Sequence, residues 1–192
     1  DNLTTATLTT APQAYALELL GSTTSITNAT TFLNTGALTL GDGAGDQLTF
    51  AGGLVATNPS AISMAGVIST NNTVMTLGDA NTGLTLSADA ELHTAGGALN
   101  IGGAVNGTTH NQQSLSLDAG SAGAISVTAG MGQTTRLKTL TLVNSNGATF
   151  TKPVTADTSV VLTDTSDGQV VRFEDNLTTA TLTTAPQAYA LE

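Results

Sequence analysis

The chain has 192 residues, of which 40% are hydrophobic and 9% charged, with 14 acidic residues against 4 basic ones and no cysteine. The hydrophobic fraction is enough to bury a core, and the lack of cysteine excludes disulfide bonds and thiolate metal sites. Neither nucleic acid nor an anionic membrane is expected as a partner, because both need basic clusters, and no run approaches the roughly 18 apolar residues of a membrane span.

Short strands are predicted along the whole chain from triplets in which one polar residue, usually Thr or Ser, separates two apolar ones. This alternation has the period of two that is typical of a strand with one buried face. In chain order the triplets lie at 38–40, 48–50, 84–86, 115–117, 125–127 and 140–142. Turn-forming residues lie between them, at 41–43, 58–60, 71–72, 102–103, 144–147 and 164–168.

The stretch TAPQAYALE at 10–18 is the least strand-like part of the chain. Pro12 cannot donate a hydrogen bond to a strand ladder, so we expect a turn or bulge at a corner of the fold. Tyr15 and its copy Tyr189 lie in this stretch and are candidates for a lateral contact, with a packed corner tyrosine as the alternative. The nearest approach to a helix, at 17–20, is too short.

Residues 1–18, DNLTTATLTTAPQAYALE, recur without change as residues 175–192. We therefore expect one full period, residues 1–174, followed by the start of the next identical period, residues 175–192. A protein built in this way would be a long tandem array. In such an array the two copies of this repeated segment would form the same coil, one period apart.

A shorter periodicity lies inside the period, marked by Ile101, Val127, Phe150 and Phe173 at intervals of 23 to 26 residues. If Phe50 is counted two steps earlier, the cycle closes in about seven steps. This spacing predicts an all-β fold, a right-handed parallel β-helix (β-solenoid) with about seven coils per 174-residue period. A string of antiparallel β-sandwiches is the competing fold, but those domains have about 100 residues and no such short step.

Four segments, at 36–43, 98–107, 113–120 and 140–150, carry a family resemblance. Their Gly-, Leu- and Asn-rich strands and turns resemble the giant β-strand-repeat surface proteins of bacteria, which are similar to filamentous haemagglutinins and large autotransporter-type adhesins. The resemblance implies a secreted protein at the bacterial cell surface that serves as an adhesin, stalk or extracellular fibre. It implies no catalytic or ligand-binding residues.

Asp42 and Asp46, in the segment 41–46, are the candidate calcium ligands, because glycine- and aspartate-rich repeats bind calcium. The aspartate spacing differs from such repeats and no second copy follows, so a tight turn is the better interpretation. His93 and His110 lack the spacing of zinc ligands, and no other metal or cofactor is expected. A more diffuse calcium site would add the carboxylates of Asp79, Asp89 and Glu91.

No catalytic residues are expected, because polysaccharide-degrading enzymes on β-helices need clustered carboxylates in a cleft. The function expected is a structural repeat of a giant extracellular fibre or adhesin shaft. Its partners would be neighbouring copies placed end to end, with lateral fibre contacts or cell-surface glycans as further ones. A multivalent glycan-binding module is the alternative, and a β-helix enzyme is the third. An enzyme site would also need a basic or second acidic group in its cleft, and the few basic residues are Arg136, Lys138, Lys152 and Arg172.

Overall fold

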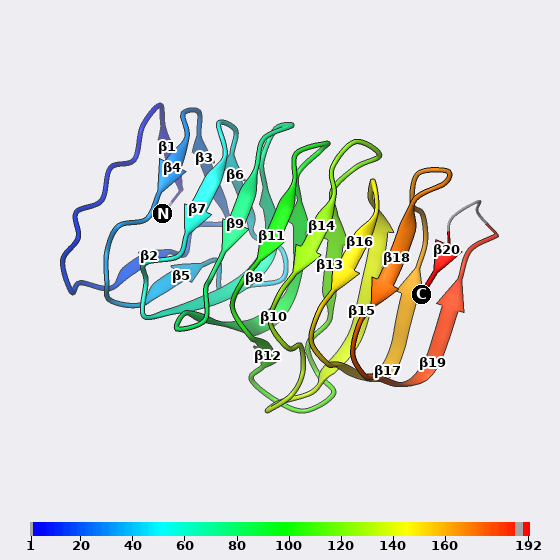
Figure 1. Ribbon diagram of the computed structural model, residues 1–192. Coiled ribbons are helices and arrows are strands. Elements are labelled where there is room, and N and C mark those ends of the chain that lie inside the picture. Colours follow the sequence, from blue (N-terminus) through cyan, green and yellow to red (C-terminus); the bar gives the residue numbers. More distant parts are fainter. Residues whose placement is uncertain (1, 187–189) are drawn as a thin grey trace.

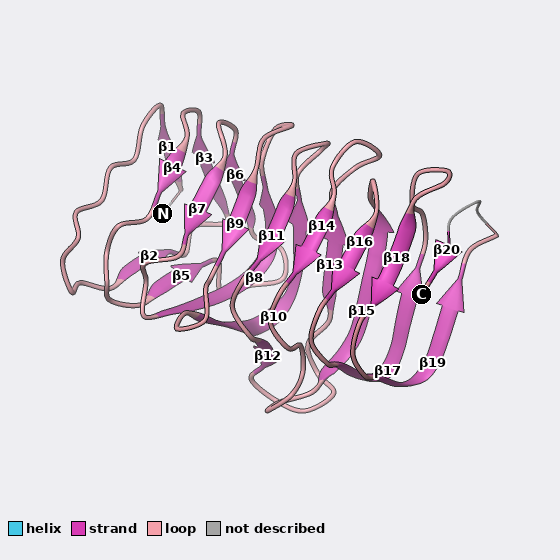
Figure 2. Ribbon diagram, viewed as in Figure 1, coloured by secondary structure: helices cyan, strands magenta, loops and turns pink. Residues whose placement is uncertain are grey.

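The computed structural model describes residues 2–186 and 190–192. Within these residues there is no helix, and the strands pair in parallel into two sheets, A and B, that wind around one axis (Figures 1 and 2). The expected parallel β-solenoid is thereby confirmed. Sheet B has one strand per turn, and its eight described strands give about eight turns from the N-terminal to the C-terminal end.

Most strands are short, and most pair with their equivalents in the coils before and after them. The described strands of sheet A are β1 (Leu3–Thr5), β2 (Leu17–Leu19), β3 (Thr23–Ile26), β5 (Leu38–Leu40), β6 (Gln47–Phe50), β8 (Ala61–Ser69), β10 (Gly83–His93), β12 (Val105–Gly107), β13 (Leu115–Asp118), β15 (Leu137–Asn144), β17 (Val154–Leu162) and β19 (Leu177–Thr184). Those of sheet B are β4 (Thr30–Thr31), β7 (Leu54–Ala56), β9 (Met75–Leu77), β11 (Leu99–Ile101), β14 (Ile125–Val127), β16 (Ala148–Phe150), β18 (Val170–Phe173) and β20 (Ala190–Leu191).

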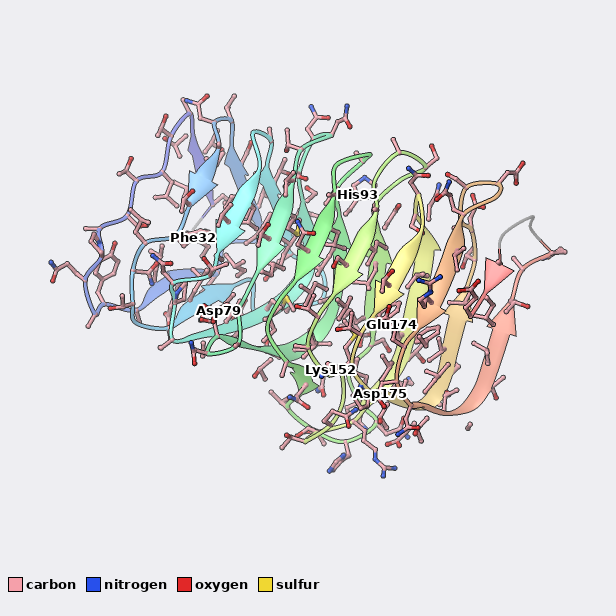
Figure 3. All side chains as sticks on the ribbon, viewed as in Figure 1. Phe32, Asp79, His93, Lys152, Glu174 and Asp175 are labelled. Atoms are coloured by element: carbon pink, nitrogen blue, oxygen red, sulfur yellow. The ribbon has the colours of Figure 1, made fainter. Side chains whose placement is uncertain are left out.

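The alternation of apolar and polar residues explains the core. In β5, for example, Leu38 and Leu40 are fully buried and Thr39 between them is half-buried, because successive side chains of a strand point to opposite faces. Repeated in each coil, this pattern forms one continuous apolar core from Leu19 to Val171. Phe32 lies inside this core, whereas polar side chains surround the outside (Figure 3).

Sheet A bends in the middle, so the solenoid has three faces. Both β5 and β6 pair with β8, and both β12 and β13 pair with β10, so one long strand spans the positions of two short ones. In β10 the bend lies at the register shift between Leu86 and Ala90. The half of sheet A beyond the bend carries the ends of β8, β10, β13 and β15, and the candidate site lies there.

The register confirms part of the predicted periodicity and corrects the rest. Ile101, Val127, Phe150 and Phe173 are paired through neighbouring strands of sheet B, as the spacing predicted. Phe50, however, lies in β6 of sheet A, whereas Ile101 lies in sheet B. The interval between Phe50 and Ile101 therefore does not measure a whole number of coils. Cα partners in adjacent coils are 19 to 26 residues apart, so many coils are shorter than the expected 25 or so residues.

The two copies of the repeated segment occupy different places. Leu17 pairs with Leu38 in sheet A, whereas its equivalent Leu191 pairs with Val171 in sheet B. The expectation that both copies form the same coil is therefore wrong in this structure. The physical reason is that the first copy packs on the coil that follows it and the second on the coil that precedes it. A Thr-rich alternating sequence can pair at either of these two places, because strand register is strongly specified only where one face is buried.

Candidate functional site

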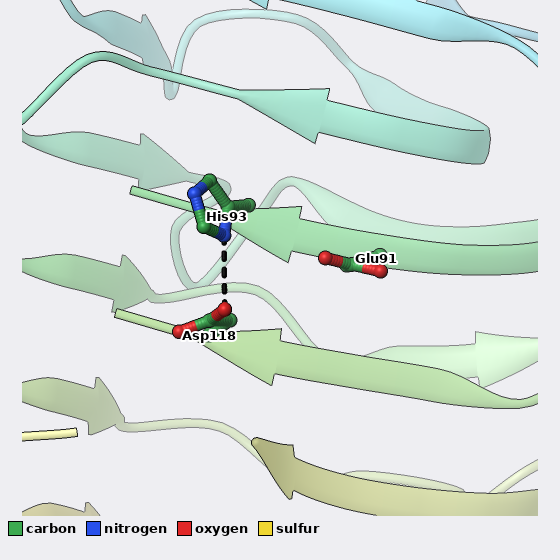
Figure 4. A group of neighbouring side chains, drawn as sticks. All are labelled: Glu91, His93 and Asp118. Carbon is green, nitrogen blue, oxygen red and sulfur yellow. Dashed lines mark hydrogen bonds and ion pairs between the residues drawn. The ribbon is translucent and has the colours of Figure 1, made fainter. Parts of the chain in front are cut away.

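A small group of ionisable side chains lies on the outer surface of sheet A, where β10 and β13 end. The group consists of Glu91, His93 and Asp118 (Figure 4). In β10 the buried residues Ala90 and Leu92 alternate with Glu91 and His93, which therefore point outward. The parallel register places Asp118 of β13 directly opposite His93.

A hydrogen bond joins two members of the group. The Nδ1 atom of His93 lies 3.0 Å from the Oδ2 atom of Asp118. The other carboxylate oxygen of Asp118 accepts a hydrogen bond from the backbone N–H of Gly120 at 2.9 Å. This second bond holds the carboxylate in place, so that Oδ2 faces the imidazole. The side chains of His93 and Asp118 are 36% and 16% exposed, so solvent reaches both of them.

Glu91 is the unpaired member of the group. Its carboxylate has no hydrogen bond or ion pair with any residue that the structure describes, yet one ligand atom from each of Glu91, His93 and Asp118 lies within 4.8 Å of the others. Glu91 also borders a surface hollow of 210 Å³, which has polar walls at Asp89, Ser114 and Ser116. The group therefore combines an imidazole, two carboxylates and room for a further small ligand.

The ladder also places Ser69 opposite His93, which gives the order Ser69, His93, Asp118 across three coils. This order resembles a nucleophile, a base and an orienting acid, but the hydroxyl of Ser69 is engaged elsewhere. It donates to the carbonyl of Leu48 at 3.3 Å and lies 3.1 Å from the hydroxyl of Thr49. Both partners belong to β6, on the far side from His93. The arrangement therefore lacks the nucleophile–base hydrogen bond that a catalytic triad requires.

Asp46, one of the two candidate calcium ligands, closes a tight turn. Its Oδ2 atom accepts hydrogen bonds from the backbone N–H groups of Asp42 at 2.9 Å and Gly43 at 3.0 Å. The N–H groups of Gly43 and Asp42 hold the pKa of the Asp46 carboxyl below its usual value, although burial opposes them. Asp42, the other candidate, is exposed. The carboxylate of Asp46 therefore has a structural role at this corner of the coil, as the turn interpretation predicted.

The other carboxylates of the diffuse calcium hypothesis are not gathered together with Asp46. Asp79 caps its own turn, since its Oδ1 atom accepts from the N–H groups of Asn81 and Thr82. Asp89 accepts from the N–H of Ser114 in the next coil at 2.7 Å. These residues hold turns and coils together, and each uses an oxygen to do so.

Tyr15 lies in an irregular corner, as the sequence predicted for the stretch around Pro12. The residue is 37% exposed, and its hydroxyl accepts a hydrogen bond from the backbone N–H of Ala11 at 3.0 Å. The exposed ring is accessible to a neighbouring molecule, so a lateral contact at Tyr15 stays a prediction. Tyr189 lies outside the described residues.

The two histidines are not brought together. The Nδ1 atom of His110 accepts a hydrogen bond from the backbone N–H of Arg136 at 3.0 Å, in a turn beyond β12. The spacing of zinc ligands within one segment does not reveal the pairing of His93 with Asp118. One signal in the sequence could reveal it, since the two residues are 25 positions apart, which is about the length of one coil.

Comparison with known proteins finds no family model, no curated protein and no solved structure that matches this chain. Among the described residues, no helix has the length and apolar character needed to cross a membrane.

Proposed function

We propose that this chain is a structural repeat of a giant extracellular fibre or adhesin shaft of a bacterial cell surface, in which successive periods share one core. The observation that carries the proposal is the continuous apolar core from Leu19 to Val171, which spans nearly the whole 174-residue interval at which residues 1–18 recur. Leu3 of the first copy pairs forward with Thr24, and the equivalent Leu177 of the second copy pairs backward with Val154. These two pairs belong to different columns of the ladder, since Leu3 aligns through successive coils with Leu162 and Leu177 aligns with Leu17, so a segment that joins two periods would adopt one of the two registers.

The side chains of the second copy support this proposal. Leu182 and Leu191 are 41% and 43% exposed, although equivalent positions of inner coils are buried. A following coil would cover them and remove apolar surface from water, at roughly 25 cal/mol for each Å². The remaining surface is rich in Thr, Ser and Asn, and the net charge is −10, which favours hydration and repulsion between shafts.

The chemistry of the surface favours a shaft over a glycan-binding module. Among the large hydrophobic side chains that are exposed, Tyr15 is the one aromatic residue within the described part of the chain. Glycan-binding loops would be expected to present clustered aromatic rings. A shaft needs only reach, stiffness and a hydrated exterior, all of which a continuous core and ladder provide.

Electron microscopy of chains with one, two and three concatenated 174-residue periods tests the proposal. We expect single thin rods of constant width that lengthen by roughly 35–40 Å per period, the rise of about eight stacked strands. A matched variant with Leu177→Asp at each internal junction should break the rods into flexibly linked pieces, whereas Thr178→Asp, on the outward face, should not. Discrete beads in the unaltered chain would contradict the proposal. Protease treatment of intact cells of the source organism would test the surface location.

A further inference from the structure

We propose that Glu91, His93 and Asp118 form a binding site for a divalent metal ion of the zinc class on the outer face of sheet A. The proposal is independent of the shaft function, because it depends on three side chains of adjacent coils rather than on how periods join. Imidazole nitrogen and carboxylate oxygen are both ordinary zinc ligands, and three protein ligands leave a coordination position open. Imidazole in the set favours zinc over calcium, which takes oxygen ligands.

The geometry is close to that of a zinc site. Zinc binds nitrogen and oxygen at about 2.0–2.2 Å, so neighbouring ligands of a tetrahedral ion lie roughly 3.3 Å apart. The Nδ1 atom of His93 and the Oδ2 atom of Asp118 are 3.0 Å apart, and a metal ion would take the place of the proton between them. The ligand atom of Glu91 lies within 4.8 Å of the other two, and its side chain is free of other partners in the described chain. A small rotation of Glu91 would bring it into coordination.

Two further observations support the proposal. The backbone N–H of Gly120 donates to the Oδ1 atom of Asp118 and so orients the carboxylate whose Oδ2 atom would bind the metal. Hydrogen bonds of this kind orient the ligands in known metal sites. The next residue along the ladder, Asn144, pairs with Asp118 and has a buried side-chain oxygen with no hydrogen-bond partner in the structure. An amide oxygen without a donor is unusual in a folded protein, and it is a group that can bind a cation or its water.

The charge around the group also suits a cation. Glu91 and Asp118 contribute two negative charges, and Asp89 lies beside Glu91 on the wall of the hollow. Two of the four basic residues are ion-paired elsewhere, Arg136 with Asp157 and Arg172 with Glu192. The side chains of His93 and Asp118 are themselves partly exposed on the outer face, so a metal ion can reach them from solvent.

Isothermal titration of the whole chain with zinc chloride tests the proposal. We expect one saturable site per chain, and a Co²⁺-loaded sample should show the visible absorption of a cobalt ion bound by nitrogen and oxygen. His93→Gln and Asp118→Asn should weaken zinc binding more than about tenfold, since even the loss of a group that only supports a ligand costs roughly 10- to 100-fold. Asn at position 118 can still accept from Gly120, so that variant should fold, which circular dichroism verifies.

His110→Gln is the matched control, because it removes the other histidine and should leave zinc affinity within about twofold of the unaltered chain. Equal losses in His93→Gln and His110→Gln would overturn the site, as would the absence of saturable binding. A tenfold excess of calcium should not displace the zinc. Displacement by calcium would overturn the assignment to an ion of the zinc class.

Discussion

Phe150 and Phe173 stack face to face in adjacent coils, with their ring centroids 4.7 Å apart and their planes inclined by 8°. They are Cα partners in sheet B, so the ring spacing follows from the distance between hydrogen-bonded strands. Phe150 is fully buried, whereas Phe173 is half-buried near the C-terminal end. We expect Phe150→Ala to lower the free energy of unfolding by about 3–5 kcal/mol, because it leaves a cavity, and Phe173→Ala to cost less. Urea unfolding measures both, and an equal or larger loss for Phe173→Ala would contradict this packing.

Gly66 should not tolerate a side chain. Its φ of +75° is in the left-handed region, and a Cβ atom there would lie 2.4 Å from the backbone oxygen of Asp46. We expect Gly66→Ala to destabilise the fold by at least about 1–2 kcal/mol from the backbone conformation alone, with the contact adding to it. Gly45→Ala is the control, since a Cβ atom at that position would have no other atom within 4 Å. If the midpoint temperature of thermal unfolding falls equally for both variants, Gly66 is less tightly packed than in the structure, which would contradict this prediction.

The turn closed by Asp46 should make stability depend on pH. The carboxyl pKa of Asp46 is lowered in the folded chain from an ordinary value of 3.8, so the folded state favours the ionised form. The stabilisation is therefore complete above that ordinary value and is lost as the pH falls through the lower, folded-state pKa. Compared with Asp46→Asn, the unaltered chain should be more stable by about 1–2 kcal/mol at neutral pH.

This difference should shrink as the solution is acidified below the ordinary pKa of an aspartate. Asp167→Asn, at an exposed position, serves as the control and should show little difference from the unaltered chain at any pH. Chemical unfolding at a series of pH values gives these differences directly. If the difference in unfolding free energy between the unaltered chain and Asp46→Asn stays constant into strong acid, the charge-based account of this turn is refuted.

Tyr15 offers a test of the predicted lateral contact between copies of this chain. Replacing Tyr15 and Tyr189 together by Ala should reduce concentration-dependent association in sedimentation velocity, because it removes an exposed ring from the corner at Tyr15 together with its counterpart in the second copy. Stability should change by less than about 1 kcal/mol, since Tyr15 is exposed. Val74→Ala, which removes another exposed apolar side chain at 48% exposure, should leave association unaltered. Unchanged association in the tyrosine variant would remove Tyr15 as a contact.

The fold could be predicted because its main determinant is local. Apolar residues that alternate with Thr specify strands, and Ile101 to Phe173 recur at the length of a coil, so parallel stacking follows. The face on which a triplet lies is not local information. Leu48-Thr49-Phe50 in sheet A has the same pattern as Ala148-Thr149-Phe150 in sheet B, and only the intervening turns distinguish them.

The candidate site could not be predicted from spacing within one segment. His93 and Asp118 meet because they end adjacent strands, and their contact depends on the register of two coils rather than on nearby sequence. Asp46 resembles a calcium ligand in the sequence because it lies among glycines, but the same turn provides the N–H groups that its carboxylate binds. Sequence alone does not tell whether an oxygen is free or already engaged with the backbone.

The direction of the ladder has a mechanical consequence. Hydrogen bonds between coils run along the solenoid axis, from Leu3 at one end through successive strands to β19 at the other. A pulling force along that axis would load each hydrogen bond along its own length. It would separate one coil from the next by breaking the hydrogen bonds between their strands. Strand pairing joins only neighbouring coils, although Thr158 bonds to Asn111 and Ser166 to Ser121 two coils away, so extension would proceed in small, repeated steps from an end. Such a rod dissipates a sudden load by releasing one coil at a time and regains its length by re-stacking.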